Sequence, residues 1–183
     1  MGKKIIYAED DTEPIRLLLR LRIPSLIFGL FLGLLLSFIT SKFETVLSQN
    51  VSLAFFIPFI VYLADAVGTQ TQTIYVRDLK TGRANFKVYL FKELVLGIIL
   101  GLLFSIMTAL IVMLWFKSYE LTLVIFLSVF GAVISAPIVA MIVSEILQLE
   151  REDPAVWAGP VATVIQDTVS VLIFGLIACA ILL

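Results

Sequence analysis

Five long apolar segments divide this chain, and they leave no room for a large water-soluble domain. They cover residues 25–41, 51–76, 88–116, 121–147 and 155–183 of a chain of 183 residues. A helix needs about 20 apolar residues to cross the hydrocarbon core of a bilayer, so each segment is long enough, or nearly so, to span it. The chain is 61% hydrophobic and 15% charged, a balance typical of helical membrane proteins. We therefore predict an all-α integral membrane protein with five transmembrane helices.

The residues before the first span have a pattern of their own. Arg16, Arg20 and Arg22 are interspersed with leucines after Pro14, which suits a short amphipathic helix at the membrane surface. The alternative is that this piece simply extends the first spanning helix. We predict a cytoplasmic N-terminal segment over residues 1–23, which contains the amphipathic helix through Arg22, and a five-helix transmembrane domain over residues 24–183.

Lys and Arg are distributed unevenly along the chain. Eleven of the 13 lie before the first span, between the second and third spans or in the first turn or so of the third (Lys92), or between the fourth and fifth. The other two connections hold only Lys42 and Lys117. Cytoplasmic loops of membrane proteins are enriched in Lys and Arg, so we predict a cytoplasmic N-terminus and an outer C-terminus. This arrangement requires an odd number of spans, in agreement with the five segments.

The second segment becomes polar at Asp65 and regains its apolar character at Ile74. An ionised carboxylate at the centre of a membrane helix costs roughly 2.5–3.5 kcal/mol, so such a residue usually faces water or an ion. Polar contacts between helices are the alternative, but they do not require an aspartate. Asp65 shares a helical face with Thr69, Gln72 and Thr73. We therefore predict that this stretch lines a pore, through Gly68, Thr69, Gln70, Gln72 and Thr73.

The fifth segment carries a second intramembrane acid. Thr163 and Asp167 are four residues apart and therefore lie on one helical face, with Gln166 close by as a further pore-lining candidate. Counted from the cytoplasmic ends at Arg77 and Ala155, Asp65 and Asp167 both lie 12 residues into the membrane. At 1.5 Å per residue this depth is roughly 18 Å, near the bilayer centre. The two carboxylates can therefore share one site.

The available ligands narrow the choice of ion. The chain contains no His and one Cys, which argues against the imidazole and thiolate sites of zinc, copper or iron. Carboxylate, hydroxyl and carbonyl oxygens are the ligands of hard cations such as Mg²⁺ and Ca²⁺. We predict a bound and transported divalent cation, with no further cofactor, at Asp167, Asp65 and Thr163.

Two other acids have simpler interpretations. Glu145, near the inner end of the fourth segment, either forms part of a cytoplasmic vestibule or pairs with Arg151. Glu93, beside Lys92, is interpreted as a residue of the membrane interface.

An ordered set of short motifs resembles the MgtE family of magnesium transporters. The set comprises Arg22-Ile23-Pro24, Phe43-Glu44, Phe56-Ile57-Pro58, Gly68-Thr69-Gln70, Arg77, Pro137, Asp153-Pro154-Ala155, Gly159-Pro160, Thr163 and Asp167. The resemblance implies a homodimer whose second and fifth helices line a central pore, with Mg²⁺ bound by Asp167. It also implies that the cytoplasmic sensor regions of the bacterial members are missing here. One departure is that Asp65-Ala66-Val67-Gly68 stands where the family commonly has Gly-Asn-x-Gly.

These observations predict transport of Mg²⁺ or a similar divalent cation across the cell (plasma) membrane, with no enzymatic activity and no nucleic-acid partner. A first alternative is an intramembrane aspartyl protease, in which two aspartates share a proton and activate water. Those proteases resemble Tyr-Asp and Gly-x-Gly-Asp around their acids, whereas Ala64 and Gln166 precede the aspartates here. A second alternative is a non-conducting partner subunit of a cation transporter.

Overall fold

The computed structural model describes residues 11–149 and 154–183, and every regular element in these ranges is helical. Two short elements, α2 (Glu44–Gln49) and the 3₁₀ helix η1 (Val51–Phe56), connect the first two long helices. The five long helices are α1 (Ile15–Ser41), α3 (Ile57–Lys80), α4 (Phe86–Phe116), α5 (Tyr119–Leu149) and α6 (Pro154–Leu182). Each provides a span long and apolar enough to cross a membrane, the second beginning in η1. The predicted all-α membrane fold is therefore confirmed.

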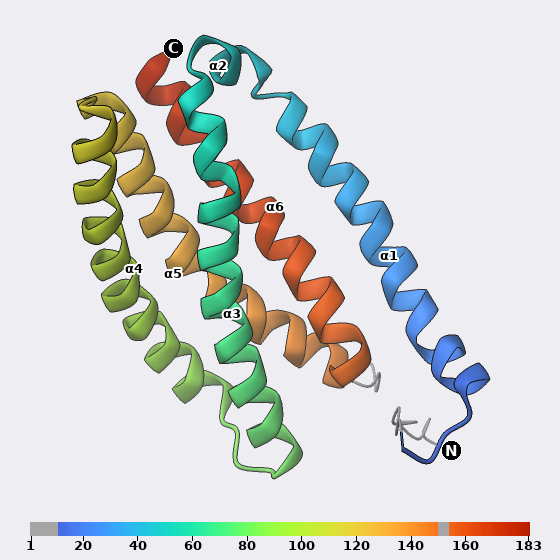
Figure 1. Ribbon diagram of the computed structural model, residues 1–183. Helices are drawn as coiled ribbons and strands as arrows, with labels where there is room; N and C mark the ends of the chain where they lie inside the picture. Colours follow the sequence, from blue (N-terminus) through green and yellow to red (C-terminus); the bar gives the residue numbers. More distant parts are fainter. Residues whose placement is uncertain (1–10, 150–153) are drawn as a thin grey trace.

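The long helices form a bundle around α5, which packs against α3, α4 and α6. In contrast, α1 packs chiefly on α6 and stands apart from the rest of the bundle (Figure 1). The turn between α3 and α4 lies at the same end as the start of α1, whereas α2 and the C-terminus lie at the other end (Figure 1). Large apolar side chains such as Leu30, Phe31 and Leu114 remain exposed on α1 and α4, as lipid-facing surfaces require.

The contact between α4 and α5 depends on small residues. Gly97, Gly101 and Ser105 recur every four residues and are buried on one face of α4. A Cβ atom added to Gly101 would lie 3.3 Å from the backbone oxygen of Phe130 on α5. Small residues at this spacing let two membrane helices approach closely, which strengthens their van der Waals packing.

The two helices are joined by a very short reversal. Lys117 adopts a left-handed backbone conformation, with φ of 51°, and its N–H donates to the Met113 carbonyl. Ser118 Oγ then accepts from the backbone N–H of Leu121 at 3.3 Å, which caps the start of α5. The chain therefore reverses within two residues and keeps α4 and α5 as antiparallel neighbours.

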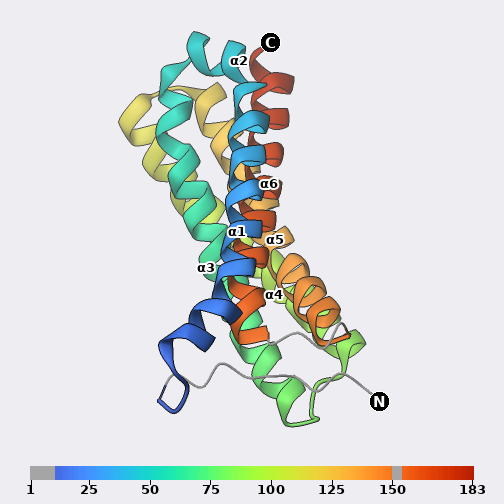
Figure 2. The same cartoon turned by 90° about the vertical axis from the view of Figure 1, so that its right-hand side faces the viewer.

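The separate amphipathic helix predicted before the first span is not present. Residues 15–41 form one continuous helix with Pro24 inside it, so the alternative of an extended first span is correct. Proline removes the N–H that would bond the carbonyl of Arg20, and this loss bends a helix without ending it. Figure 2 shows the start of α1 turned away from the remainder of the helix. The predicted boundary between residues 23 and 24 therefore falls within α1.

Candidate cation site

The two intramembrane aspartates lie across the contact between α3 and α6. Asp65 is on α3 and Asp167 is on α6, and these helices pack directly against each other. Both side chains are half-buried, and they are close enough to interact electrostatically. The structure therefore brings together the two carboxylates that the sequence places at one depth.

One oxygen of this pair lacks any partner. Asp167 Oδ1 is buried and makes no hydrogen bond within the part of the chain that the structure describes. Among the interactions of the described residues, the ion pair of Arg77 with Asp78 involves neither aspartate, and the charge that acts on Asp167 is that of Asp65. Buried polar atoms are nearly always satisfied, so an orphaned carboxylate oxygen indicates a position for water or a bound cation.

Threonine hydroxyls lie one or two helical turns from the aspartates along both helices. Thr163 is half-buried one turn before Asp167 on α6. On α3, Thr69 and Thr73 are exposed, and Thr73 Oγ1 donates to the Thr69 carbonyl at 2.8 Å. This bond uses the hydroxyl proton, which leaves the oxygen as an acceptor. Gln72, also predicted to line the pore, is half-buried on α3.

Two predicted pore-lining residues pack elsewhere in this chain. Gly68 is buried against α5, where an added Cβ would lie 3.4 Å from the Ala136 carbonyl oxygen. Gln166 is 3% exposed, and its Nε2 donates to α5 at the Ala132 carbonyl and Ser135 Oγ, both at 3.3 Å. Each helix turns only one side toward the aspartate pair, and Gly68 and Gln166 lie on the sides that face α5. The structure therefore does not bring them to the carboxylates.

Gln70 lines a different cavity, between α3, α4 and α5. The cavity has a volume of about 90 Å³ and is also lined by Thr71, Glu93 and Pro137. Thr71 is buried and its hydroxyl donates to Glu93 Oε2 at 2.7 Å. The interpretation of Glu93 as a simple interfacial residue was therefore incomplete, because its carboxylate joins α4 to α3.

Glu145 accepts a hydrogen bond from a residue of α3. The hydroxyl of Tyr75, a fully buried residue of α3, donates to Glu145 Oε2 at 2.7 Å. The ring of Tyr75 also meets that of Tyr89 edge to face, with 5.1 Å between centroids. Arg151, the alternative partner, lies outside the described residues. A vestibule role for Glu145 stays a prediction.

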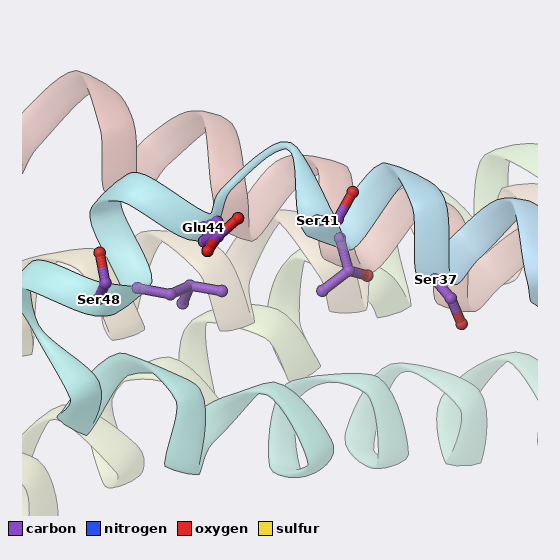
Figure 3. Close-up of a pocket in the computed structure, with 6 residues that line it drawn as sticks. Ser37, Ser41, Glu44 and Ser48 are labelled. Carbon is purple, nitrogen blue, oxygen red and sulfur yellow. The ribbon is translucent and has the colours of Figure 1, made fainter.

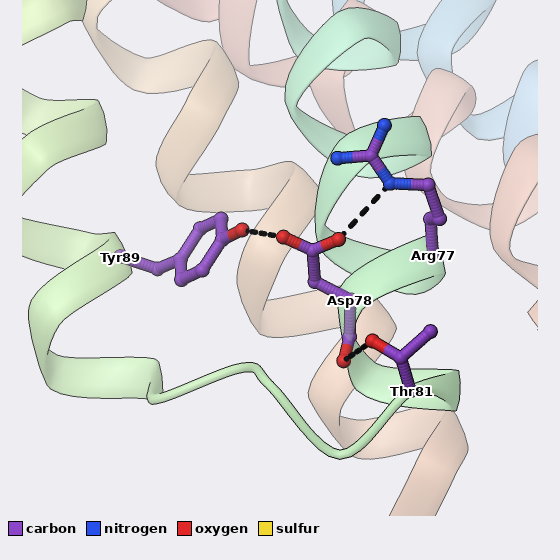
Figure 4. A network of polar contacts seen from close by, with 4 residues as sticks. All are labelled: Arg77, Asp78, Thr81 and Tyr89. Atoms are coloured by element: carbon purple, nitrogen blue, oxygen red, sulfur yellow. Dashed lines mark hydrogen bonds and ion pairs between the residues drawn. The ribbon is translucent and has the colours of Figure 1, made fainter.

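Figure 4 shows a polar network at the C-terminal end of α3 that was not predicted from the sequence. Asp78 accepts from the Tyr89 hydroxyl and from Arg77 Nε, the latter at 3.0 Å, while its backbone carbonyl accepts from Thr81 Oγ1 at 3.0 Å. The network joins the end of α3 to the first turn of α4. Asp78 lies in a basic stretch at the end of a span, where a charged residue carries no distinctive signal.

The sequence pattern of the MgtE family, described as a divalent cation transporter, matches residues 57–177. This region is well over half of the chain and includes both aspartates. The chain belongs to the MgtE family. The resemblance that its motifs indicated is thereby confirmed.

A curated MgtE relative supports the same assignment over a longer region. "Magnesium transporter MgtE" of Bacillus subtilis (strain 168) is 34% identical over 162 residues, which cover 87% of this chain and 36% of that protein. The chain thus spans about a third of the length of this relative. The MgtE family is one of transporters, so the prediction that this chain is not an enzyme is confirmed and the protease alternative is set aside.

Proposed function

We propose that this chain carries Mg²⁺ or a similar divalent cation across the cell membrane, through a pore formed between two copies and lined by α3 and α6. The observation that carries the proposal is the pairing of Asp65 and Asp167 without a basic partner among the described residues. A single divalent cation balances both negative charges. A monovalent cation leaves one charge uncompensated in a medium where that charge is costly.

The exposed side of α3 supports a pore shared by two copies. Thr69 and Thr73 are exposed although the helix spans the membrane, and a lone chain would present these hydroxyls to lipid. Polar residues within membrane helices usually face the bundle interior or a water-filled cavity. A second copy placed against this side encloses the polar surface, and two copies supply four carboxylates.

The same geometry suits an ion that retains most of its water. Mg²⁺ loses its hydration shell reluctantly and usually binds through one or two carboxylates together with water. Asp167 Oδ1 then accepts from an ion-bound water or contacts the ion directly, while Asp65 and the Thr163 hydroxyl complete the polar lining. A small number of contacts allows the ion to leave as well as to enter.

The proposed orientation follows the distribution of basic residues. The turn between α3 and α4, with Arg77, Arg83 and Lys87, faces the cytoplasm. The start of α1 lies at this end, and α2 and the C-terminus face outward (Figure 1). Ions entering the cell therefore pass from the α2 end toward the α3–α4 turn.

Uptake into proteoliposomes made with the purified chain tests the proposal. Asp167→Asn is expected to fold and to reduce Mg²⁺ flux at least tenfold, because a charge-assisted contact of about 1.5–3 kcal/mol is lost. Asp65→Asn is expected to reduce flux as well. Glu120→Gln, which removes an exposed carboxylate at the start of α5, is the control and is expected to leave flux unchanged. Unaltered flux through Asp167→Asn would exclude the proposed site.

The same preparation decides between a transporter and a partner subunit. The chain is purified without other polypeptides, so Mg²⁺ entry into these vesicles requires that it conduct by itself. Parallel uptake of Ca²⁺, Mn²⁺ and Co²⁺ ranks the cations. If the wild-type chain admits none of these ions, the alternative of a non-conducting subunit is favoured.

A further inference from the structure

A second polar pocket lies far from the aspartate pair in sequence, where α1 ends and α2 begins. It has a volume of about 500 Å³ and opens to the surface. Figure 3 shows Ser37, Ser41, Glu44 and Ser48 following one another along α1 and α2. The pocket is lined by these four residues together with Thr40 and Leu47. Five of its six lining side chains therefore carry oxygen, and none carries nitrogen.

The hydroxyl protons of this pocket are already used within the helices. Each hydroxyl donates to a backbone carbonyl three or four residues earlier: Ser37 to Gly33 at 3.2 Å, Thr40 to Leu36 at 2.8 Å, Ser41 to Phe38 at 2.7 Å and Ser48 to Thr45 at 3.0 Å. A hydroxyl that has donated its proton offers only lone pairs to a ligand. An ionised Glu44 is also an acceptor only. The side chains that line the pocket thus present acceptors alone, with one negative charge.

Lys42, the basic residue closest to Glu44 in the sequence, contacts an aromatic ring. Lys42 Nζ lies over the ring of Phe38, 4.3 Å from its centroid, and neither residue lines the pocket. In this cation–π contact the ammonium group forms no ion pair with Glu44. A ligand for the pocket must therefore supply both hydrogen-bond donors and positive charge.

The volume of the pocket accommodates a hydrated cation. A divalent cation with six bound waters occupies roughly 200 Å³, if the ion and each of the six waters take about 30 Å³, the volume of one water molecule in the liquid. The pocket is large enough to hold this complex without stripping its water. The water hydrogens of the complex are the donors that the hydroxyl and carboxylate oxygens require.

We propose that the pocket is an outer-sphere binding site for a hydrated divalent cation, with Glu44 supplying the charge and the hydroxyl oxygens of α1 accepting from bound water. This inference rests on the proposed transport function and orientation, in which the α2 end faces outward. The pocket lies where α1 meets α2, and α2 is at the end of the bundle opposite the α3–α4 turn (Figure 1). The pocket would therefore concentrate ions before they reach the aspartate pair.

The first test compares two carboxylates at the same end of the bundle. Glu44→Gln is expected to raise the external Mg²⁺ concentration for half-maximal uptake between about two- and fivefold, the range of an exposed charge interaction, with little change in maximal flux. Glu120→Gln removes the same charge at the same end, outside the pocket. An equal change in both variants would show that the effect comes from surface charge in general, and would exclude the proposed site.

The second test measures binding without transport. Hexaamminecobalt(III) has an exchange-inert shell that presents only N–H donors, so it reports outer-sphere binding alone. Titration calorimetry is performed on the full chain carrying Asp65→Asn and Asp167→Asn, which removes the other anionic site. Binding is expected to weaken at least about twofold with Glu44→Gln and measurably with Ser37→Ala combined with Ser41→Ala. Glu120→Gln is expected to have no effect.

Different results would contradict the transport proposal and the pocket proposal. If the wild-type chain conducts no Mg²⁺, the proposed function is lost, but calorimetry still determines whether the pocket binds the complex. If the Glu44 and serine variants bind as the unaltered pocket does, the pocket proposal is wrong even where Asp167→Asn abolishes uptake. All three substituted residues are exposed, so the variants are expected to fold.

Discussion

At the scale of single residues, Gly175 fixes how closely the outer end of α6 fits the corner between α1 and α2. Phe43 is 9% exposed and its ring lies against α6 at this position. A Cβ atom added to Gly175 would lie 2.4 Å from three ring atoms of Phe43, well inside van der Waals contact. Only glycine therefore accommodates the ring without displacing it.

Gly175→Ala is expected to destabilise the protein by about 1–3 kcal/mol, because overpacking forces Phe43 from its place. The measurement is the thermal unfolding midpoint in detergent. Gly33→Ala is the matched control, since nothing lies within 4 Å of its added Cβ and alanine favours a helix by about 1 kcal/mol. Equal midpoints for the two variants would contradict the close contact.

The residues of the candidate site differ in how far the sequence could reveal them. Asp65 and Asp167 stand out because a carboxylate in an apolar segment has few structural explanations. The sides on which Gly68 and Gln166 lie could not be predicted, since the rotation of each helix about its axis depends on packing with α5. The bond between Thr71 and Glu93 joins residues 22 positions apart, and no local pattern indicates it.

At the scale of elements, α3 is attached to its neighbours by side-chain hydrogen bonds at three levels. The bond from Thr71 to Glu93 is nearest the aspartates, that from Tyr75 to Glu145 follows one turn later, and Asp78 accepts from Tyr89 near the helix end. Direct packing between α3 and α4 is slight, so the two bonds to α4 are important for their alignment. The position of α3, which lines the proposed pore, thus depends on polar contacts away from the aspartates.

Tyr75→Phe is expected to reduce the free energy of unfolding by about 1–3 kcal/mol, because Glu145 loses a hydrogen bond from a buried donor. Tyr62→Phe makes the same chemical change at a side chain that is 70% exposed and is expected to have little effect. Chemical unfolding of both variants in the same detergent measures the difference. No loss of stability in Tyr75→Phe relative to Tyr62→Phe would show that the bond is not important for the fold.

The lengths of the long elements were largely predictable, because hydrophobic runs of this length are almost always spanning helices. The third segment, predicted over residues 88–116, corresponds to Phe86–Phe116 in the structure. The continuity of α1 through Pro24 was left open, since proline is compatible with both a break and a bend. The helix α2 was not predicted, because six residues are too few for a periodic pattern.

At the scale of the whole molecule, the exposed face of α3 is the surface on which the proposed dimer depends. Thr69 and Thr73 are exposed on this face, and α1 makes its main contacts with α6 instead of α3. A second copy related by twofold symmetry would place these surfaces against each other, as closed homo-oligomers require.

Cross-linking tests this arrangement. With Cys179 replaced by Ser, Thr69→Cys is expected to give a covalent dimer when membranes are treated with a short bifunctional thiol reagent. Leu110→Cys on α4, where Leu110 is 63% exposed, is expected to remain monomeric under the same treatment. A dimer through Leu110→Cys alone would place the interface on α4 and exclude a pore lined by α3.

Labelling of intact cells tests the orientation. In the same Cys-free background, Ser48→Cys at the α2 end is expected to react with a membrane-impermeant maleimide, because it is exposed on the predicted outer side. Thr81→Cys, exposed after α3, is expected to react only once the membrane is permeabilised. The reverse pattern would invert the assignment.

The loose attachment of α1 has a consequence for biogenesis. Because α1 is held chiefly by α6 and Asp167 is only half-buried, a single copy of the proposed dimer would leave part of this side chain open to acyl chains. Hydrocarbon cannot solvate that carboxylate, so an unassembled copy is penalised until a second one arrives or water fills the gap. Abundance in the cell is therefore expected to follow pairing efficiency during synthesis, with unpaired copies becoming substrates for membrane proteases.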